Sequence, residues 1–153
     1  MVRNVHEREL PVPAGPFVDR IQELWPVAGW PAMRFDRPLG VGADGGHGPI
    51  RYRCTEFEPG ESITFAFSSG EGTHTLSASG NVLKHELVGN FRLATRLRWA
   101  LVTRWLHDAC LEDLLDNFER AAGREPVAPA RWSPWVRLVH RALGLVSSRS
   151  ARV

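Results

Sequence analysis

The middle of the chain contains four consecutive segments in which apolar and polar residues alternate. They span residues 50–58, 61–68, 73–79 and 82–91, and short linkers that contain glycine separate them. Alternation with a period of two is typical of strands, and such linkers are typical of hairpin turns. The four segments therefore predict an antiparallel meander, and this feature constrains the fold more than any other.

Counting residues outward from the three turns places the apolar residues of all four segments on one face. The other face carries arginine, threonine, serine and lysine. A shift of one residue at any turn would mix the two faces, so the agreement of three turns supports the register. We expect a bulge at Pro59-Gly60, because that dipeptide suits a tight hairpin poorly. The apolar residues of the predicted inner face are Ile50, Tyr52, Cys54, Ile63, Phe65, Phe67, Leu76, Leu87 and Phe91.

Prolines and glycines break the chain before the meander. Residues 2–10 predict a first strand, residues 17–25 a short amphipathic helix, and residues 33–39 an edge strand, because Pro38 excludes a central one. Residues 40–49 hold five glycines without the Gly-Lys-Ser/Thr ending of a phosphate-binding loop. We interpret this stretch as a flexible lid over a pocket.

A long helix is predicted after the meander, over residues 92–122. From His107 onward it has a clear apolar stripe, and Gly123 is a suitable C-cap. The part over residues 97–106 is apolar all round, so we expect it to be buried or covered. The stripe consists of Leu111, Leu114, Leu115, Phe118 and Ala122. The opposite, polar side carries Asp113, Asp116, Glu119 and Arg120.

The segment after the long helix is predicted to be a separable appendage. A proline-containing linker comes first, and Ser133 followed by Pro134 is a helix start signal. We expect a basic amphipathic helix from Pro134 to Val146, with residues 147–153 frayed. Its expected docking face is Trp135, Leu138, Val139 and Ala142.

Three hypotheses for this tail helix remain open. It packs against residues 97–106 of its own chain, it joins two copies into a homodimer, or it lies on an anionic membrane surface. The membrane hypothesis depends on basic residues beside Trp132 and Trp135, a combination that suits a lipid interface.

Composition and charge restrict the class of protein. The 153 residues are 43 % hydrophobic and 24 % charged, which suits a globular chain with one core. The net charge of +2 hides an asymmetry: residues 124–153 carry six arginines and one acid, whereas the remainder carries 13 basic and 16 acidic residues. A nucleic-acid-binding domain would spread basic charge over its folded face, so we expect no nucleic-acid partner.

The lack of targeting signals and the pair of isolated cysteines predict a cytoplasmic location. No run approaches the ~20 apolar residues of a membrane span, and residues 1–7 carry no signal-peptide core. Cys54 and Cys110 are far apart and form neither a disulfide framework nor a zinc site, so we expect both to be small buried hydrophobes.

Four stretches carry a resemblance to a known superfamily. They are VRNVHEREL at 2–10, WPAMRFD at 30–36, YRCTEFEPG at 52–60 and LHDA at 106–109. With the predicted order of strand, short helices, meander and long helix, the chain resembles the START / pollen-allergen (SRPBCC) superfamily. More narrowly, it is similar to the bacterial polyketide cyclase/dehydrase-like branch. The resemblance covers residues 2–123.

The resemblance implies an α+β helix-grip fold, a curved antiparallel sheet wrapped around a long C-terminal helix. We therefore divide the chain into a helix-grip ligand-binding domain, 1–123, and a linker with an extra basic amphipathic C-terminal helix, 124–153. The superfamily holds lipids, polyketides, hormones or aromatic metabolites in a deep pocket between sheet and helix. Some members catalyse cyclisation or dehydration there, but no universal catalytic residue exists to assign.

Polar groups on the predicted inner face form the candidate site. His74 and His85 are diagonal neighbours on adjacent strands, within ~7–8 Å at Cβ. Imidazoles and a phenol suit general acid–base chemistry near neutral pH, so His74, His85 and Tyr52 are the candidate catalytic residues. Arg104 and His107 are expected to point from the long helix into the same space. The candidate ligand-binding residues are Tyr52, Cys54, Glu56, Phe65, Phe67, His74, Leu76, His85, Leu87, Arg104, His107 and Leu111.

The same residues also fit a purely structural role. Histidines on strands are often satisfied core or rim residues, Tyr52 suits packing with a hydrogen-bonded hydroxyl, and Glu56 near a strand end suits solvent. His74 and His85 lack a clear third metal ligand, so we expect no metal and no cofactor.

Three hypotheses for function follow. The first is binding of a small hydrophobic or aromatic metabolite, polyketide- or lipid-like, in the cavity between sheet and helix. The second is a polyketide cyclase or dehydratase that uses the pocket histidines and tyrosine as acid and base. The third is a partner- or membrane-associated module with a closed pocket. Convergent polar groups would favour the second, and polar groups confined to the rim would favour the first.

Overall fold

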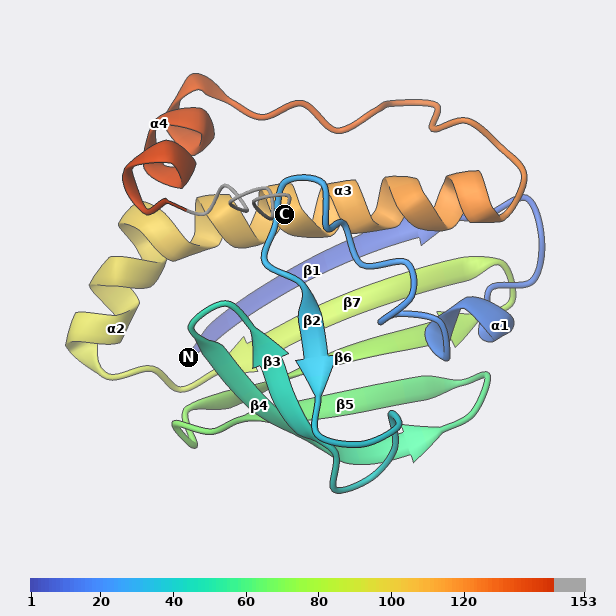
Figure 1. Cartoon of the computed structure of the whole chain (residues 1–153), viewed down its shortest axis with the longest axis horizontal. Helices are drawn as coiled ribbons and strands as arrows, with labels where there is room; N and C mark the ends of the chain where they lie inside the picture. Colours follow the sequence, from blue (N-terminus) through green and yellow to red (C-terminus); the bar gives the residue numbers. More distant parts are fainter. Residues whose placement is uncertain (145–153) are drawn as a thin grey trace, which may run out of the picture.

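A long helix lies across one face of a seven-stranded antiparallel sheet, and the sheet curves around it (Figure 1). The computed structural model describes residues 1–144. This arrangement confirms the predicted α+β helix-grip fold. The elements are β1 (Val2–Glu9), α1 (Gly15–Val18), β2 (Met33–Phe35), β3 (Asp44–His47), β4 (Ile50–Glu58), β5 (Ser62–Phe67), β6 (Gly72–Ser79), β7 (Val82–Gly89), α2 (Leu93–Arg98), the π-helical turn η1 (Trp99–Thr103), α3 (Arg104–Ala121) and α4 (Pro134–Ala142).

The strands follow the order β1-β7-β6-β5-β4-β3-β2, so the predicted meander is confirmed as β4 to β7. The first strand returns to pair with β7 along its whole length. This pairing leaves β1 and β2 at the two edges of the sheet. The short β2 at an edge agrees with the restriction that Pro38 places on that segment.

The predicted register is confirmed in full between β6 and β7, but between β4 and β5 only beyond the bulge, because Glu58 faces Ser62 instead of Glu61 next to the turn. Tyr52 faces Phe67 across β4 and β5, and His74 faces Leu87 across β6 and β7. Between β5 and β6 the strands are shifted by two residues, so that Phe65 rather than Phe67 faces His74. A shift of two keeps each side chain on its predicted face, because side chains of a strand alternate with period two.

The β-bulge lies between Cys54 and Glu56, so its predicted position at Pro59-Gly60 is wrong. Gly60 adopts φ +75°, a left-handed conformation that glycine provides without strain, and this residue closes the turn without a bulge. The extra residue in β4 turns Glu56 outward and brings Phe57 against the core.

The glycine-rich stretch at 40–49 contains strand β3, so the predicted flexible lid is wrong. The strand pairs with β2 on one side and β4 on the other. A Cβ at Gly45 would lie 2.0 Å from the Arg34 carbonyl oxygen, and one at Gly46 would lie 1.9 Å from the Ile50 carbonyl oxygen. These glycines therefore allow β2, β3 and β4 to approach closely, and β3 carries His47 at its end.

The long helix is interrupted by one wide turn. A π-helical segment, η1, joins α2 to α3, and the N–H of Arg104 donates to the carbonyl of Trp99. From α3, the predicted apolar stripe packs into the core between helix and sheet. Its buried members are Leu111, Leu114, Leu115 and Phe118, which meet Ile63, Phe65, Leu76 and Leu83 from the sheet. Of the predicted short helix at 17–25, only α1 is helical, and it starts two residues earlier.

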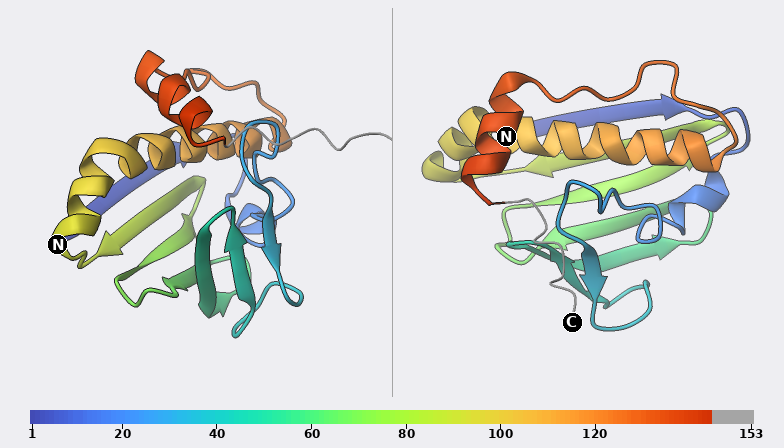
Figure 2. Two further views of the ribbon diagram at one scale, coloured as in Figure 1. Left: turned by 60° about the vertical axis from the view of Figure 1, so that its left-hand side comes forward. Right: turned by 45° about the horizontal axis from the view of Figure 1, so that its top comes forward.

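After α3, the chain turns back and runs along the side of that helix that faces away from the sheet (Figure 2). The backbone N–H of Ala130 donates to Asp116 at 2.8 Å, and the indoles of Trp30 and Trp132 both donate to Asp113, at 2.8 and 2.9 Å. These bonds fix the linker to α3 and to the loop that precedes β2.

The tail helix α4 packs on its own chain, with the Ser133 hydroxyl capping the N–H of Val136 as the sequence predicts. Its buried residues are Val136, Val139 and His140, and the His140 imidazole bonds the carbonyl of Gly29 at 2.6 Å. The predicted docking face is confirmed at Val139 and wrong at Trp135, Leu138 and Ala142, which are exposed. The expected end at Val146 and the frayed residues 147–153 lie outside the described residues.

Among residues 1–144, no helix is long and apolar enough to cross a membrane.

Candidate functional site

The inner face of the sheet positions two buried histidines side by side. His74 on β6 and His85 on β7 alternate with Leu76, Leu83 and Leu87, so the pleat turns all five side chains toward α3. The two imidazoles are 8 % and 3 % exposed, and His74 Nδ1 lies 3.3 Å from His85 Nε2. Their predicted inward orientation is thus confirmed.

Further imidazoles extend this pair in both directions. Toward β3, the His74 ring contacts the Tyr52 ring at 4.8 Å between centroids, and the Tyr52 hydroxyl bonds His47 Nδ1 at 3.1 Å. Toward α3, the ring of His85 lies 5.3 Å from that of His107. We call His47, Tyr52, His74, His85 and His107 the inner array. It crosses the interior from β3 to the helix α3.

Burial keeps the inner array neutral. Removal from water lowers the pKa of His47 to about 4 and that of His74 to about 3, and the neighbouring imidazoles add to this lowering. The same causes hold the pKa of His85 well below its usual value, and burial also lowers the pKa of His107. Burial raises the pKa of the Tyr52 phenol. At neutral pH these groups offer neutral donors and acceptors.

The inner array has unused hydrogen-bonding capacity. His74 Nε2 and His85 Nδ1 are buried and have no hydrogen-bond partner among the described residues, and the buried His107 Nδ1 has only Asp108 Oδ1 near it, at 3.6 Å, too far for a hydrogen bond. Buried polar atoms usually find partners, and a missing partner costs roughly 1–3 kcal/mol. Three such atoms in one neighbourhood are the feature that a bound polar group would satisfy.

A hollow opens beside the array, between the ends of β4 and β5 and the α2–η1 segment. It has a volume of about 270 Å³. Phe67, Phe91 and Trp99 form its aromatic wall, whereas Glu71, Arg98 and Thr103 are among its polar rim residues. Phe67 stacks on His74 at 5.2 Å, and Trp99 lies 5.3 Å from His107. This mouth hollow is therefore separated from the inner array by single aromatic rings.

His6 on β1 has the opposite electrostatic character. His6 bonds Glu112 through Nδ1 at 2.8 Å and Asp108 through Nε2 at 3.1 Å. Burial alone would lower its pKa, but the two carboxylates outweigh burial and raise the pKa to about 9. His6 is therefore a cation at neutral pH.

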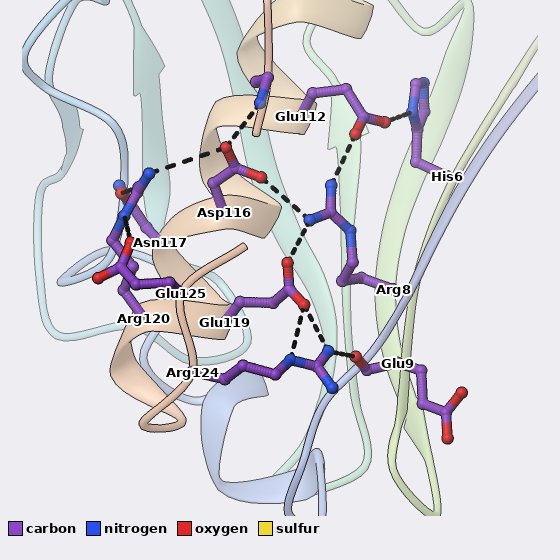
Figure 3. Close-up of polar contacts among 11 residues, drawn as sticks. His6, Arg8, Glu9, Glu112, Asp116, Asn117, Glu119, Arg120, Arg124 and Glu125 are labelled. Carbon is purple, nitrogen blue, oxygen red and sulfur yellow. Dashed lines mark hydrogen bonds and ion pairs between the residues drawn. The ribbon is translucent and has the colours of Figure 1, made fainter. Parts of the chain in front are cut away.

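The charges around His6 continue along α3 as a buried network (Figure 3). Arg8 donates to Glu112, Asp116 and Glu119 at 2.6–3.0 Å, and Arg124 donates to Glu119 from below. Asp116 and Glu119 are 3 % and 1 % exposed, so their predicted solvent-facing position is wrong. The physical reason is that β1 and the linker cover that side of α3.

One group of residues has metal-ligand chemistry. The ligand atoms of His6, His107 and Asp108 lie within 4.8 Å of one another. Because both ring nitrogens of His6 already bond carboxylates, a metal would first have to displace a proton from it. The present contacts therefore describe an ion network that joins β1 to α3.

Most predicted ligand-binding residues lie where the register put them. Tyr52, Cys54, Phe65, His74, Leu76, His85, Leu87 and Leu111 are buried on the inner side. Phe67 lines the mouth hollow, and His107 lies against His85.

Two predicted positions are wrong. Glu56 is exposed because the bulge in β4 reverses its side chain. Arg104 is exposed and lies 3.5 Å from Asp108, which faces β1 and not the inner array. The wide turn η1 just before Arg104 shifts the helix phase that the prediction had extrapolated.

Sequence reasoning missed His47 and Trp99. His47 was assigned to a glycine-rich lid, although it stands directly before a two-residue connection into β4. The signal that could have located His47 is the two-residue linker at 48–49, which is short enough to be the turn of a β-hairpin. Trp99 lay in a stretch that is apolar all round, where periodicity gives no direction.

No family model and no curated protein matches the sequence. Solved structures do match in fold. A solution structure from Thermobifida fusca superposes with a TM-score of 0.57 at 13 % identity, covering 82 % of this chain and 98 % of the other. The Aha1 dimer from Colwellia psychrerythraea gives a TM-score of 0.51 at 15 % identity, with coverages of 78 % and 97 %.

A further match is DynU16, a protein in the dynemicin biosynthetic locus. It gives a TM-score of 0.53 at 16 % identity, and the match covers 85 % of this chain and 49 % of DynU16. At these identities the likeness shows the fold alone, which is the helix-grip fold that the sequence predicted, and membership of the SRPBCC superfamily stays a prediction. The polyketide cyclase branch stays a prediction.

Proposed function

We propose that the protein binds a small hydrophobic or aromatic molecule in the mouth hollow, with a polar group of that molecule directed toward the inner array. The observation that carries this proposal is the juxtaposition of an aromatic wall with three buried nitrogen atoms that lack partners. Apolar pockets with a few convergent polar groups are the usual form of small-molecule sites.

The size and chemistry of the hollow restrict the ligand. A volume of about 270 Å³ lies just below the range of ligand pockets, roughly 300–1,000 Å³, so the buried part of the molecule is small. Phe67, Phe91 and Trp99 favour a flat or aromatic body. The imidazoles lie behind the rings of Phe67 and Trp99 and do not line the hollow, so a ligand would reach them only past these rings. A neutral imidazole accepts from a hydroxyl or donates to a carbonyl, so an oxygenated aromatic molecule of the polyketide type is the ligand class we propose.

The neutral state of the imidazoles in the inner array favours binding over catalysis. A general base works best when its pKa lies near the working pH. With the pKa of His74 at about 3 and that of His47 at about 4, these imidazoles are weak bases in the unliganded protein. They are, however, well suited to hydrogen bonding without charge.

Native mass spectrometry of the full-length protein tests this function by looking for a retained small molecule. Thr103→Phe should fill the hollow and abolish retention, because Thr103 lines it. Val102→Phe is the matched control, since Val102 directly precedes Thr103, is also half-buried and does not line the hollow. The fluorescent dye anilinonaphthalenesulfonate serves as a second probe of the same pair. The proposal is wrong if both variants retain molecule and dye like the wild type, or if the wild type retains neither.

A cyclase or dehydratase remains the second candidate, because His74, His85 and Tyr52 converge in one place. A bound carbonyl that bonds these groups would change their pKa values and would give them acid–base roles. For a dehydratase, His85→Gln should retain a molecule one water heavier than the molecule that the wild type retains. An identical mass in both proteins, with unchanged isomer composition, would exclude this candidate.

A further inference from the structure

The first turns of the long helix expose a row of large apolar side chains. Leu93, Leu97, Leu101 and Trp105 recur every four residues and are 72 %, 56 %, 63 % and 46 % exposed. Residues of this size at a helix surface are usually turned toward a core. The predicted burial of residues 97–106 is therefore wrong for this face, although Trp99 is buried on the other side.

The wide turn helps to keep this row on one face. An α-helix has 3.6 residues per turn, so residues spaced by four drift around the axis. The π-helical turn η1 holds one more residue than an α-helical turn, and it lies across Leu101 between Leu97 and Trp105. The wide turn therefore reduces the rotation of the row around the helix axis between Leu97 and Trp105, and keeps these side chains on one face.

The tail helix extends the row sideways. The Trp135 indole donates to the backbone carbonyl of Leu101 at 3.1 Å, which places α4 beside η1 (Figure 2). Leu138 lies one turn further along α4 and is 59 % exposed. Leu93, Leu97, Leu101, Trp105, Trp135 and Leu138 together form what we call the apolar surface.

The helical segments that form the apolar surface carry basic charge, and the two acids at their border, Glu71 and Asp108, pair with Arg92 and Arg104. Residues 91–107 contain four arginines and no acid, and α4 adds Arg137 and Arg141 without an acid. All six arginines are exposed. Arg96, Arg98, Arg137 and Arg141 form no ion pair with any acid in the described part of the chain.

We propose that this surface docks on an anionic lipid bilayer, with the apolar side chains in the headgroup–acyl boundary and the arginines at the lipid phosphates. Leucine and tryptophan on one face with arginines around them are the composition of helices that lie in a membrane interface. Each arginine near an anionic surface adds to the attraction. No helix among residues 1–144 could span the bilayer, so the contact is peripheral.

A second copy of the chain fits this surface less well. A two-fold dimer through the same face would bring two sets of four arginines together, those at 96, 98, 137 and 141, which have no ion pair in the described part of the chain. Anionic lipid supplies the missing negative charge. The surface also borders the mouth hollow, because Thr95, Arg98 and Trp99 of the same helical segment line that opening. A docked protein would therefore present the hollow next to the lipid.

The test is co-sedimentation of the full-length protein, without added ligand, with phosphatidylcholine vesicles that contain phosphatidylserine. Wild type should sediment with these vesicles and not with phosphatidylcholine alone, and added salt should release it. The double variant Leu97→Asp/Leu101→Asp should lose about tenfold or more in bound fraction. Both positions are exposed, so urea melts should show unchanged stability.

The matched control is Val41→Asp/Val127→Asp, which places the same two charges at apolar residues that are exposed elsewhere. It should keep most of the vesicle binding. Equal sedimentation of the Leu97/Leu101 variant and the wild type would overturn the proposal. So would a dimer in light scattering that the Leu97/Leu101 variant dissociates while no vesicle binding occurs, because the occupant would then be a second copy.

Discussion

Between sheet and helix, His6 lies close to the histidines of the inner array, yet it is charged at neutral pH whereas they are neutral. His6 on β1 lies between two carboxylates, and its pKa is raised to about 9. His74, two strands away and without a carboxylate beside it, has a pKa lowered to about 3. Both side chains are largely buried, so burial alone does not decide the outcome.

The difference is made by what α3 presents to each set. Toward β1 the helix presents Asp108, Glu112, Asp116 and Glu119, which turns that side into a network of ion pairs. Toward the middle of the sheet it presents His107 and apolar side chains. The charged side joins helix to sheet, whereas the neutral side keeps hydrogen-bonding atoms unused and open to a ligand.

The largest effect is expected at the charged side, from Arg8→Met. This variant leaves Asp116 and Glu119 buried with fewer cations, and loss of one partner from a buried network costs about 3–5 kcal/mol. Urea melts at neutral pH measure the loss. The matched control is Arg3→Met on the same strand, whose exposed pair with Glu86 is worth less than about 1 kcal/mol. Equal losses in the two variants would show that the network is not a buried one.

A smaller effect is expected from His6→Gln, and it should depend on pH. The pKa of His6 is about 9 in the folded protein and about 6.5 when unfolded, so its protonation stabilises the fold fully below pH 6.5 and not above pH 9. The stability gap between wild type and variant should therefore shrink by about 2 kcal/mol between about pH 7 and about pH 9.5. Urea melts at the two pH values measure this change. A gap that stays constant would mean that His6 is not held as a cation.

The sequence predicted the neutral side better than the charged side. Alternation along β6 and β7 placed His74 and His85 inward, and even the two-residue shift between β5 and β6 left their faces unchanged. Because side chains of a strand alternate between its faces, a register shift of two residues leaves the predicted face unchanged, whereas a shift of one residue reverses it. The bulge in β4 is an odd shift, and it reversed Glu56.

The charged side could not be predicted from the helix pattern. Asp116 and Glu119 follow the spacing of a solvent-facing side, and their burial depends on Arg8, Ala130 and Arg124, which are distant in sequence or lie beyond the helix. The same limit applies to α4. Its pattern predicted an apolar docking face through Trp135 and Leu138, but the indole pair of Trp30 and Trp132 fixes the linker so that Val136 and His140 turn inward instead.

The smallest effect is expected from His74→Gln, and it should have the opposite pH dependence to His6→Gln. In the folded protein the pKa of His74 is about 3, whereas an unfolded histidine takes up its proton near pH 6.5. The stability that depends on its neutral state is therefore full above pH 6.5 and is lost as the pH falls from 6.5 toward 3. A glutamine takes up no proton, so this part of the acid sensitivity disappears.

Urea melts of each protein at about pH 7 and about pH 5.5 measure the effect, and each protein serves as its own reference, so that packing costs of the substitution cancel. The loss of stability on acidification should be smaller by about 1 kcal/mol in His74→Gln than in wild type. The same loss should be larger than wild type in His6→Gln, because that variant lacks the histidine whose protonation stabilises the fold. If the acid-induced loss of stability changes in the same direction in both variants, the division into a charged and a neutral set is wrong. The inner array would then hold a proton at neutral pH, although His74 is buried.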